Sequence, residues 1–271
     1  MQNFLSQWQI DEIFKLGIQA GEIAKTAFLT NNFEIFIKKD NSKVSSVDLQ
    51  ISELIYKNLS KICPNIPIIC EEALNKNLED IHETFFLIDP IDGTSSFINN
   101  SNEFCINIAL IHNAKPIFGF INAPLYEDGK VYYNNNLNQI IFYNLKKNIS
   151  EICHYQVLTK QQLKIVTSIR TKDEDIKNFI QQFYPQFINN FSLIKLSSAI
   201  KFFKIIDGTS NVYLHTRKSM EWDIASGHAL INIIQLHLNN IYFENNNFYL
   251  GDELQYKKKN FINNSFVINA L

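Results

Sequence analysis

The chain has 271 residues, of which 46% are hydrophobic and 19% charged, and its formal net charge is −2. This length and composition fit one large globular domain or two modest ones. The near-neutral balance gives no global basic field, so we expect no nucleic-acid partner.

The N-terminal stretch and the cysteines exclude further classes of protein. Residues 1–13 carry Asp11 and Glu12 and have no basic region or long apolar core, so we expect no signal peptide. No apolar run approaches the roughly 20 residues that span a membrane. The four cysteines show no CxxC spacing, which favours free thiols over a disulfide framework or a zinc site. We therefore expect a cytoplasmic protein.

Hydrophobic periodicity in the first half predicts a helical pair laid on an antiparallel sheet. The first helix covers residues 7–29, and Ser45 or Ser46 is the expected N-cap of the second. Pro90 has no N–H, so we expect the strand of residues 85–88 to end there. The other predicted strands are 33–37, 66–69, 103–111, 116–123, 131–133 and 140–143.

Residues 144–161 are polar and show no clear periodicity, which places a lobe boundary near residue 150. Beyond it, strand and helix patterns alternate, as in a sheet covered by helices. The predicted strands are 164–167, 191–196 and 211–215, the helices are 173–183, 198–207 and 220–234, and short strands fill 241–271. We thus predict an α+β lobe of residues 1–150 and an α/β lobe of residues 151–271.

The stretch FFLIDPIDGTSSF, residues 85–97, carries the most informative chemistry. An apolar run ends in Asp89, Asp92 follows three residues later, and Gly93 precedes three hydroxyl residues. Gly93 permits a sharp turn, and a helix beginning after it would direct free N–H groups at the strand end. Carboxylates bind Mg²⁺, and helix N-termini bind anions. The stretch therefore predicts a site for a metal and a phosphate.

Three further carboxylates, Asp48, Glu71 and Asp223, stand at the ends of predicted elements. Singly, each is explained by helix capping or by a solvated loop. Together with the aspartates of residues 85–97 they predict one acidic site, because crowded carboxylates persist when cations neutralise them. Two or three Mg²⁺ ions would clamp the attacking and leaving oxygens of a phosphoryl transfer. Thr94 would hold the attacking water and Asp48 would take its proton.

Two blocks resemble the signature motifs of the inositol monophosphatase superfamily. They are Asp89-Pro90-Ile91-Asp92-Gly93-Thr94, with Glu71-Glu72 upstream, and Trp222-Asp223-Ile224-Ala225-Ser226-Gly227. Residues 103–110, 197–202 and 220–223 are similar to the CysQ-like 3′(2′),5′-bisphosphate nucleotidase branch of that superfamily. The resemblance covers nearly the whole chain. It implies the layered αβαβα sugar-phosphatase fold, of mixed α+β and α/β class.

The resemblance also implies roles for single residues. The implied metal ligands are Glu71, Asp89, the carbonyl of Ile91, Asp92 and Asp223. Asp48 and Thr94, with Glu71, would activate the nucleophilic water, and Gly93, Thr94, Ser95, Ser198 and Asp223 would contact substrate. The implied reaction converts adenosine 3′,5′-bisphosphate to AMP and phosphate, in support of sulfur assimilation, with Mg²⁺ as cofactor and Li⁺ as inhibitor.

Positive charge in the second lobe suggests a second anion contact. Lys201, Arg217 and Lys218 would supply it on the substrate side, since a bisphosphate needs a further cationic partner. The alternative is that these residues are solvated surface charge. Two departures from the family also bear on the substrate: Ser197 stands where the branch has glycine, and Thr216 stands where inositol-specific members carry a glutamate.

Other functions and properties stay open at this point. The alternatives are an inositol or sugar monophosphatase, and a protein that binds metal and phospholigand without turnover. The sequence leaves open a monomer or a homodimer, and peripheral association with the inner membrane surface. Cys70 beside Glu71 raises the hypothesis of a redox switch, against the simpler one of an inert buried thiol.

Overall fold

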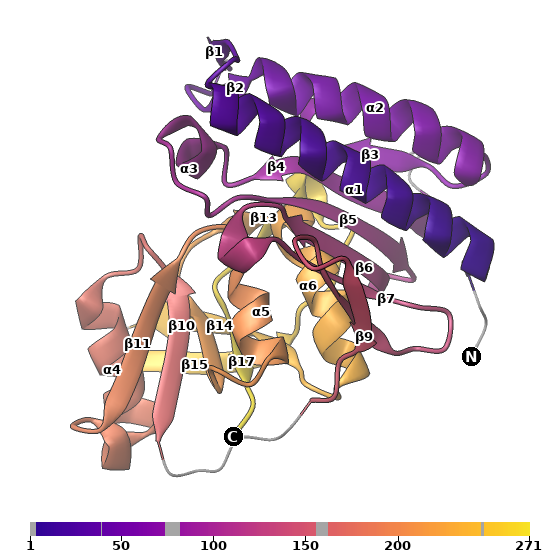
Figure 1. Ribbon diagram of the computed structural model, residues 1–271. Coiled ribbons are helices and arrows are strands. Elements are labelled where there is room, and N and C mark those ends of the chain that lie inside the picture. The colour runs from indigo at the N-terminus through magenta and orange to yellow at the C-terminus, as the bar shows by residue number, and fades with distance from the viewer. Residues whose placement is uncertain (1–3, 39, 74–81, 156–161, 245–246) are drawn as a thin grey trace.

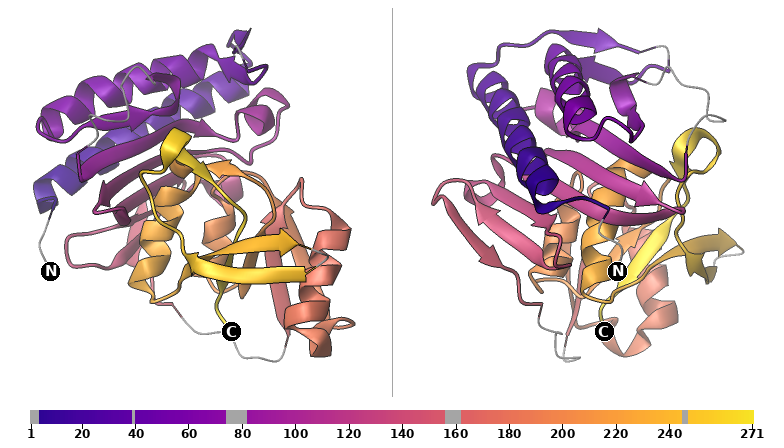
Figure 2. Two further views of the ribbon diagram at one scale, coloured as in Figure 1. Left: turned by 180° about the vertical axis from the view of Figure 1, so that it is seen from behind. Right: turned by 90° about the vertical axis from the view of Figure 1, so that its right-hand side faces the viewer.

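The computed structural model describes residues 4–38, 40–73, 82–155, 162–244 and 247–271. Its helices and sheets form five alternating layers (Figures 1 and 2). The outer layers are α1 (Gln7–Thr30) with α2 (Ser46–Ile62) on one side and α4 (Asp173–Phe183) on the other. Between the two large sheets lie α5 (Lys201–Ile206) and α6 (Glu221–Ile233). The αβαβα order implied by the sequence resemblance is confirmed.

A seven-stranded sheet supports α1 and α2, with its strands in the order β3-β4-β5-β6-β7-β8-β9. The pair β3 and β4 is parallel, and every other neighbouring pair is antiparallel. The strands are β3 (Ile68–Cys70), β4 (Thr84–Asp92), β5 (Cys105–His112), β6 (Lys115–Ala123), β7 (Lys130–Asn134), β8 (Ile140–Asn144) and β9 (Ile149–Ile152). Strand β9 was not predicted, because its four residues are all exposed and carry no burial pattern.

The second large sheet has six strands in the order β11-β10-β12-β17-β14-β15. Strand β10 is parallel to both β11 and β12, and the remaining pairs are antiparallel. The strands are β10 (Leu163–Ser168), β11 (Phe191–Leu196), β12 (Val212–His215), β14 (Leu238–Glu244), β15 (Asn247–Glu253) and β17 (Phe266–Asn269). Two small ribbons pair β1 (Ile35–Ile37) with β2 (Lys43–Ser45), and β13 (Ser219–Met220) with β16 (Ile262–Asn263).

Strand β4 continues past Pro90, so the prediction that it ends there is wrong. Asp89 pairs with Asn107 and Asp92 with Cys105, and the register shifts between these pairs. A bulge of this kind accommodates a proline that has no N–H to donate. Both aspartates therefore lie at the C-terminal end of one strand. Gly93 follows with φ +92° and begins the short helix α3 (Thr94–Ile98).

The two long helices of the first layer are capped by serines. Ser6 accepts the backbone N–H of Gln9 and forms a capping box at the start of α1. Ser45 does the same for α2 with Asp48 as its partner, which confirms Ser45 as the cap. The apolar faces of both helices are buried against the sheet. The cap of α2 therefore also holds the side chain of Asp48, one of the carboxylates that the sequence predicts in the site.

Helix α6 joins the two sheets through close backbone contact. A Cβ atom on Gly119 of β6 would lie 2.1 Å from the carbonyl oxygen of Ser226, so only glycine fits. One continuous core cluster takes side chains from both sheets and from α5 and α6. The lobe boundary near residue 150 stays a prediction. Within the described ranges, no helix has the length and hydropathy that a membrane crossing requires.

Candidate active site

A pocket of about 520 Å³ lies where β4 ends and α6 begins, and residues of the six-stranded sheet form its other side. Every residue that the sequence placed in the site lines this pocket, with one exception. Asp48 lies behind the lining and contacts Thr94. The lining includes Glu71, Asp89, Ile91, Asp92, Gly93, Thr94, Ser95, Ser198, Lys201 and Asp223.

Three carboxylates converge in the pocket. Glu71, Asp89 and Asp223 each offer an oxygen, and these atoms lie within 4.8 Å of one another. They come from the residue after β3, the end of β4 and the first turn of α6. Burial and the charge of Glu71 raise the pKa of Asp89 well above its ordinary value. Burial and the charge of Asp92 do the same to the pKa of Asp223.

This donor set fits a hard divalent cation. Carboxylate oxygens are the ligands that Mg²⁺ and similar ions take in proteins, and a cation relieves the repulsion that raises these pKa values. The Asp223 side chain is already oriented, because one oxygen accepts the Met220 N–H at 2.9 Å. Asp89 is held likewise by the Ile91 N–H at 3.1 Å. These residues can therefore hold a metal without rearrangement of the helix or the strand.

Asp92 differs from the other carboxylates. Its Oδ2 accepts the Ala199 N–H at 2.5 Å and the Asn107 side-chain amide at 3.2 Å. In the described part of the chain the convergent group comprises the three carboxylates above, and Asp92 stands outside it. The contact with Ala199 ties the end of β4 to the loop that precedes α5. No pattern in the sequence predicts this contact between Asp92 and Ala199.

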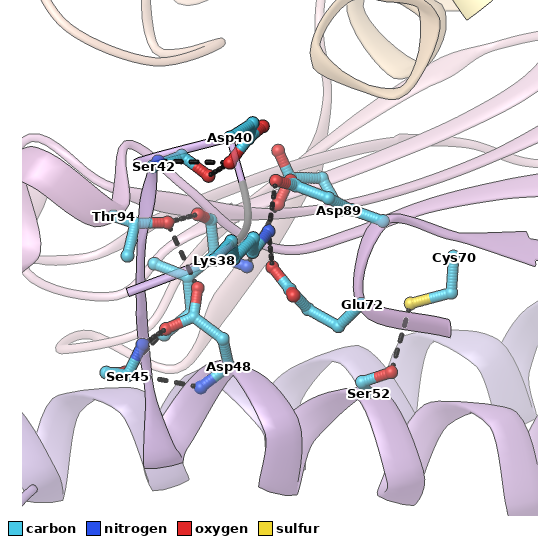
Figure 3. Close-up of polar contacts among 12 residues, drawn as sticks. Lys38, Asp40, Ser42, Ser45, Asp48, Ser52, Cys70, Glu72, Asp89 and Thr94 are labelled. Atoms are coloured by element: carbon cyan, nitrogen blue, oxygen red, sulfur yellow. Dashed lines mark hydrogen bonds and ion pairs between the residues drawn. The ribbon is translucent and has the colours of Figure 1, made fainter. Parts of the chain in front are cut away.

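Thr94 and Asp48 form a hydrogen-bonded pair at the edge of the pocket (Figure 3). The Oγ1 atom of Thr94 lies 3.0 Å from Asp48 Oδ1 and 2.9 Å from the carbonyl oxygen of Ile91. The other oxygen of Asp48 accepts the Ser45 N–H at 2.9 Å and the Ser45 hydroxyl at 2.5 Å. Burial raises the pKa of Asp48 despite these bonds. The carboxylate is thus fixed in orientation with one oxygen on the threonine.

Lys38, between β1 and β2, reaches into the acidic group (Figure 3). Its ammonium lies 3.0 Å from Glu71 Oε1 and 2.7 Å from Glu72 Oε1. Partial burial opposes the charge on Lys38, but the two glutamates raise its pKa above the ordinary value. Burial raises the pKa of Glu72 to about 7. Sequence reasoning missed Lys38 because residues 38–43 have only the pattern of a polar turn.

Helix α5 begins with a buried lysine that lines the pocket. Lys201 is 5% exposed and donates to the carbonyl of Ser198, so the alternative of a solvated surface charge is wrong for this residue. Burial lowers the pKa of Lys201, although the charge of Asp92 opposes the shift. Ser197 stands where the CysQ-like branch has glycine, but its φ is not positive. The positive φ, +52°, is at the next residue, Ser198. The backbone N–H of Ser197 donates to Glu103 Oε2 at 2.7 Å.

Cys70 lies next to the acidic group but is shielded. Its side chain is 2% exposed, and its sulfur lies 3.2 Å from the hydroxyl of Ser52. Burial raises the pKa of Cys70 to about 11. A thiol that is buried and protonated at neutral pH is a poor nucleophile, which supports the inert alternative. All four cysteines are free thiols, as predicted.

The five αβαβα layers, with an acidic pocket at the end of β4, are the architecture of the sugar-phosphatase fold. Residues 8–232 match the inositol monophosphatase family. The chain is 31% identical over 225 residues to the 3′(2′),5′-bisphosphate nucleotidase CysQ of Buchnera aphidicola subsp. Acyrthosiphon pisum (strain APS), covering 82% of this chain and 80% of that one. With the CysQ protein of Escherichia coli (strain K12) it shares 25% identity over 269 residues, 96% of this chain and 99% of that one. The chain therefore belongs to the inositol monophosphatase family.

Solved structures agree with the fold. CysQ from Bacteroides thetaiotaomicron, a bacterial member of the inositol monophosphatase family, aligns with a TM-score of 0.76 at 21% identity, covering 99% of this chain and 98% of that one. A staphylococcal inositol monophosphatase-1 aligns with a TM-score of 0.71 at 17% identity, covering 98% of this chain and 91% of that one. Both the predicted family and the predicted fold class are confirmed.

Proposed function

We propose that this protein is a Mg²⁺-dependent phosphatase that removes the 3′-phosphate of adenosine 3′,5′-bisphosphate and releases AMP. The observation that carries the proposal is the convergence of Glu71, Asp89 and Asp223 beside the hydrogen-bonded pair Thr94 and Asp48. The names of the bacterial relatives, which match 82% and 96% of the chain, support the substrate.

Glu71, Asp89, Asp92, Asp223 and the carbonyl of Ile91 would hold two or three Mg²⁺ ions. All five line one pocket, and a carbonyl oxygen has two lone pairs, so Ile91 can serve both Thr94 and a cation. Bound Mg²⁺ lowers the pKa of a coordinated water and screens the charge of the phosphate.

The protein's own groups would orient the water and take up its proton. The Thr94 hydroxyl accepts a hydrogen bond from the water while it donates to Asp48, and Asp48 receives the proton by way of that hydroxyl. The water oxygen bonds to phosphorus as the bond from phosphorus to O3′ breaks. The electron pair of that bond stays on O3′, which takes a proton from solvent water as AMP leaves. Gly93, Ser95 and Ser198 line the same pocket and would hold the phosphate oxygens.

The test is phosphate release from three substrates: adenosine 3′,5′-bisphosphate, inositol 1-phosphate and fructose 1,6-bisphosphate. We expect release from the nucleotide to require Mg²⁺, to fall when Li⁺ is added and to exceed release from the two sugar phosphates. A preference for inositol 1-phosphate would instead identify a monophosphatase of the same family. Absence of release from all three, with Mg²⁺ and ligand still bound, would identify a binding protein without turnover.

A further inference from the structure

A second pocket, of about 400 Å³, lies at the far end of α6 from the candidate active site. The first turn of α6 carries Asp223, whereas its C-terminal half lines the second pocket through Ala229, Asn232 and Ile233. At 1.5 Å per residue, Asp223 and Asn232 are roughly 14 Å apart along the helix. The start of α1, strands β5 and β6 and the loop after β7 complete the lining. The two pockets share no described lining residue, so they are separate sites.

Among the described residues, the lining of the second pocket has no charged side chain, since each member is apolar or asparagine. The candidate active site, by contrast, is lined by both carboxylates and cationic side chains. A charged molecule that entered the second pocket would give up its hydration without gaining an ion pair, which costs free energy. The second pocket therefore favours an uncharged molecule.

Asparagines contribute the polar part of this lining, and they are of two kinds. Asn134 is 5% exposed, and its side-chain amide accepts the Gly119 N–H at 2.8 Å and donates to the Ile117 carbonyl at 3.2 Å. These bonds hold the end of β7 against β6. Asn136 and Asn232 are half-buried, and their side-chain amides have no bonding partner in the described part of the chain. The lining thus offers two free amides, each of which can both donate and accept.

Apolar side chains make up the remainder of the lining. Ile10 and Leu110 are buried, and Ile117 and Ile233 are half-buried. Half-buried apolar surface gains free energy when a ligand removes it from water. Sites for small molecules typically combine such surfaces with a few polar groups that fix orientation, in a volume of about 300–1,000 Å³. The second pocket has this make-up.

We propose that this pocket is a second ligand site, for an uncharged small molecule with an apolar body and a head group that both donates and accepts hydrogen bonds, such as a primary amide. Apolar side chains such as Ile117 and Ile233 would contact the body, and the free amides of Asn136 and Asn232 would bond to the head group. The inference goes beyond the proposed function and does not depend on it, because no residue of the phosphatase site takes part.

Three probes with one apolar body and different head groups test the proposal: 3-phenylpropanamide, 3-phenylpropanoate and 3-phenylpropylammonium. Methyl NMR of labelled protein locates each probe, because Ile117 and Ile233 line the second pocket whereas Ile169 and Ile224 line the candidate active site. We expect the amide to shift the signals of Ile117 and Ile233 with a Kd on the order of 1 mM. The two charged probes should bind there at least about tenfold more weakly.

Asn232→Asp adds a negative charge to the second pocket and keeps the shape of the side chain. This variant should bind 3-phenylpropylammonium more tightly than the amide, which reverses the order expected for the wild type. Asn136→Asp makes the same test in the loop after β7, so the result does not depend on the folding of one helix variant. Asn189→Asp is the matched control, because Asn189 is exposed and lies outside both linings. It should leave the order unchanged.

Equal affinities for the three probes would overturn the inference, as would shifts confined to Ile169 and Ile224. An order of affinities that neither aspartate variant changes would overturn it too. Shifts of Ile117 and Ile233 that depend on protein concentration without a probe would show that a second copy of the chain covers the pocket, and would likewise overturn the small-molecule site. Failure of the proposed function affects none of these outcomes, because none of them requires turnover.

Discussion

The hydroxyl of Thr94 has one hydrogen and two acceptors within reach, Asp48 Oδ1 at 3.0 Å and the Ile91 carbonyl at 2.9 Å. The donor serves one of them at a time, so the direction of this hydrogen decides whether an oxygen lone pair faces the pocket. Asp48 is fixed by two bonds from Ser45 and cannot turn to follow the threonine. Orientation of a water at this position therefore depends on the threonine hydroxyl itself.

Thr94→Val should lower kcat by roughly 10²- to 10⁴-fold, the range measured for loss of a positioned acid–base group. Valine keeps the shape of the side chain but cannot bond to Asp48, whereas Thr94→Ser retains the hydroxyl and should retain most of the activity. Steady-state kinetics on adenosine 3′,5′-bisphosphate would show the loss in kcat with KM little changed. Near wild-type turnover by the valine variant would contradict the proposed role.

At the scale of the element, α2 carries a carboxylate of the candidate site in its own capping box. Ser45 accepts the N–H groups of Val47 and Asp48, and the Asp48 carboxylate accepts from Ser45 in return. Helix α1 has the same device in Ser6 and Gln9, far from the pocket. The two caps differ in consequence, since only the cap of α2 holds a group of the candidate site.

Ser45→Ala and Ser6→Ala should each cost about 1 kcal/mol of unfolding free energy, the usual effect of losing a serine cap. Only Ser45→Ala should also lower kcat, because Asp48 loses the Ser45 hydroxyl donor and is then held by the backbone N–H of residue 45 alone. Chemical denaturation and kinetics on the same preparations would separate the effects. Parallel changes in kcat for both variants would point to general destabilisation instead.

Helix α6 depends on the absence of a side chain at Gly119. A Cβ there would press on the Ser226 carbonyl oxygen at 2.1 Å, and this backbone atom cannot rotate away. Gly119→Ala should therefore destabilise the protein by about 1–3 kcal/mol. Gly251→Ala is the control, because its Cβ would meet the ring of Tyr242, a half-exposed side chain that can move. Thermal unfolding of both variants measures the difference, and an equal shift would show that the α6 contact is not special.

At the scale of the whole molecule, the sequence predicted the elements that carry their own periodic signal. Helices α1 and α4 were predicted within one residue, because uninterrupted amphipathic patterns need no tertiary information. Strand β9 was missed because its residues are exposed throughout, and β4 was cut short because a bulge can absorb a proline. Edge strands and bulges depend on their neighbours and not on local preference.

The same distinction holds for the candidate site. Carboxylates at the ends of strands and helices could be predicted to meet, since such ends gather at one edge of a sheet. The bond from Ala199 to Asp92 and the approach of Lys38 to Glu71 could not. They arise where loops distant in sequence are brought together by packing, and a loop carries no periodicity that fixes where its side chains point.

The buried acidic group should make the stability of the metal-free protein fall as pH rises. The pKa values of Asp89 and Asp223 are raised by burial and by neighbouring carboxylates, and that of Glu72 is raised to about 7 by burial. Above the ordinary carboxyl pKa of about 4, the folded protein therefore holds more protons than the unfolded chain. Stability then decreases with pH through the window that ends at the folded-state pKa values.

Melting temperatures of chelator-treated protein should therefore be higher at pH 5 than at pH 8. Mg²⁺ should restore more of the loss at pH 8, because a bound cation replaces the protons and stabilises the folded state by mass action. Asp223→Asn removes one carboxylate from the group, so it should flatten the pH dependence and weaken the response to Mg²⁺. Lys146→Ala, which removes an exposed cation paired with Asp128, is the control and should alter neither. A melting temperature that rises from pH 5 to pH 8 without metal would show that the carboxylates are not the dominant titrating groups of the folded protein.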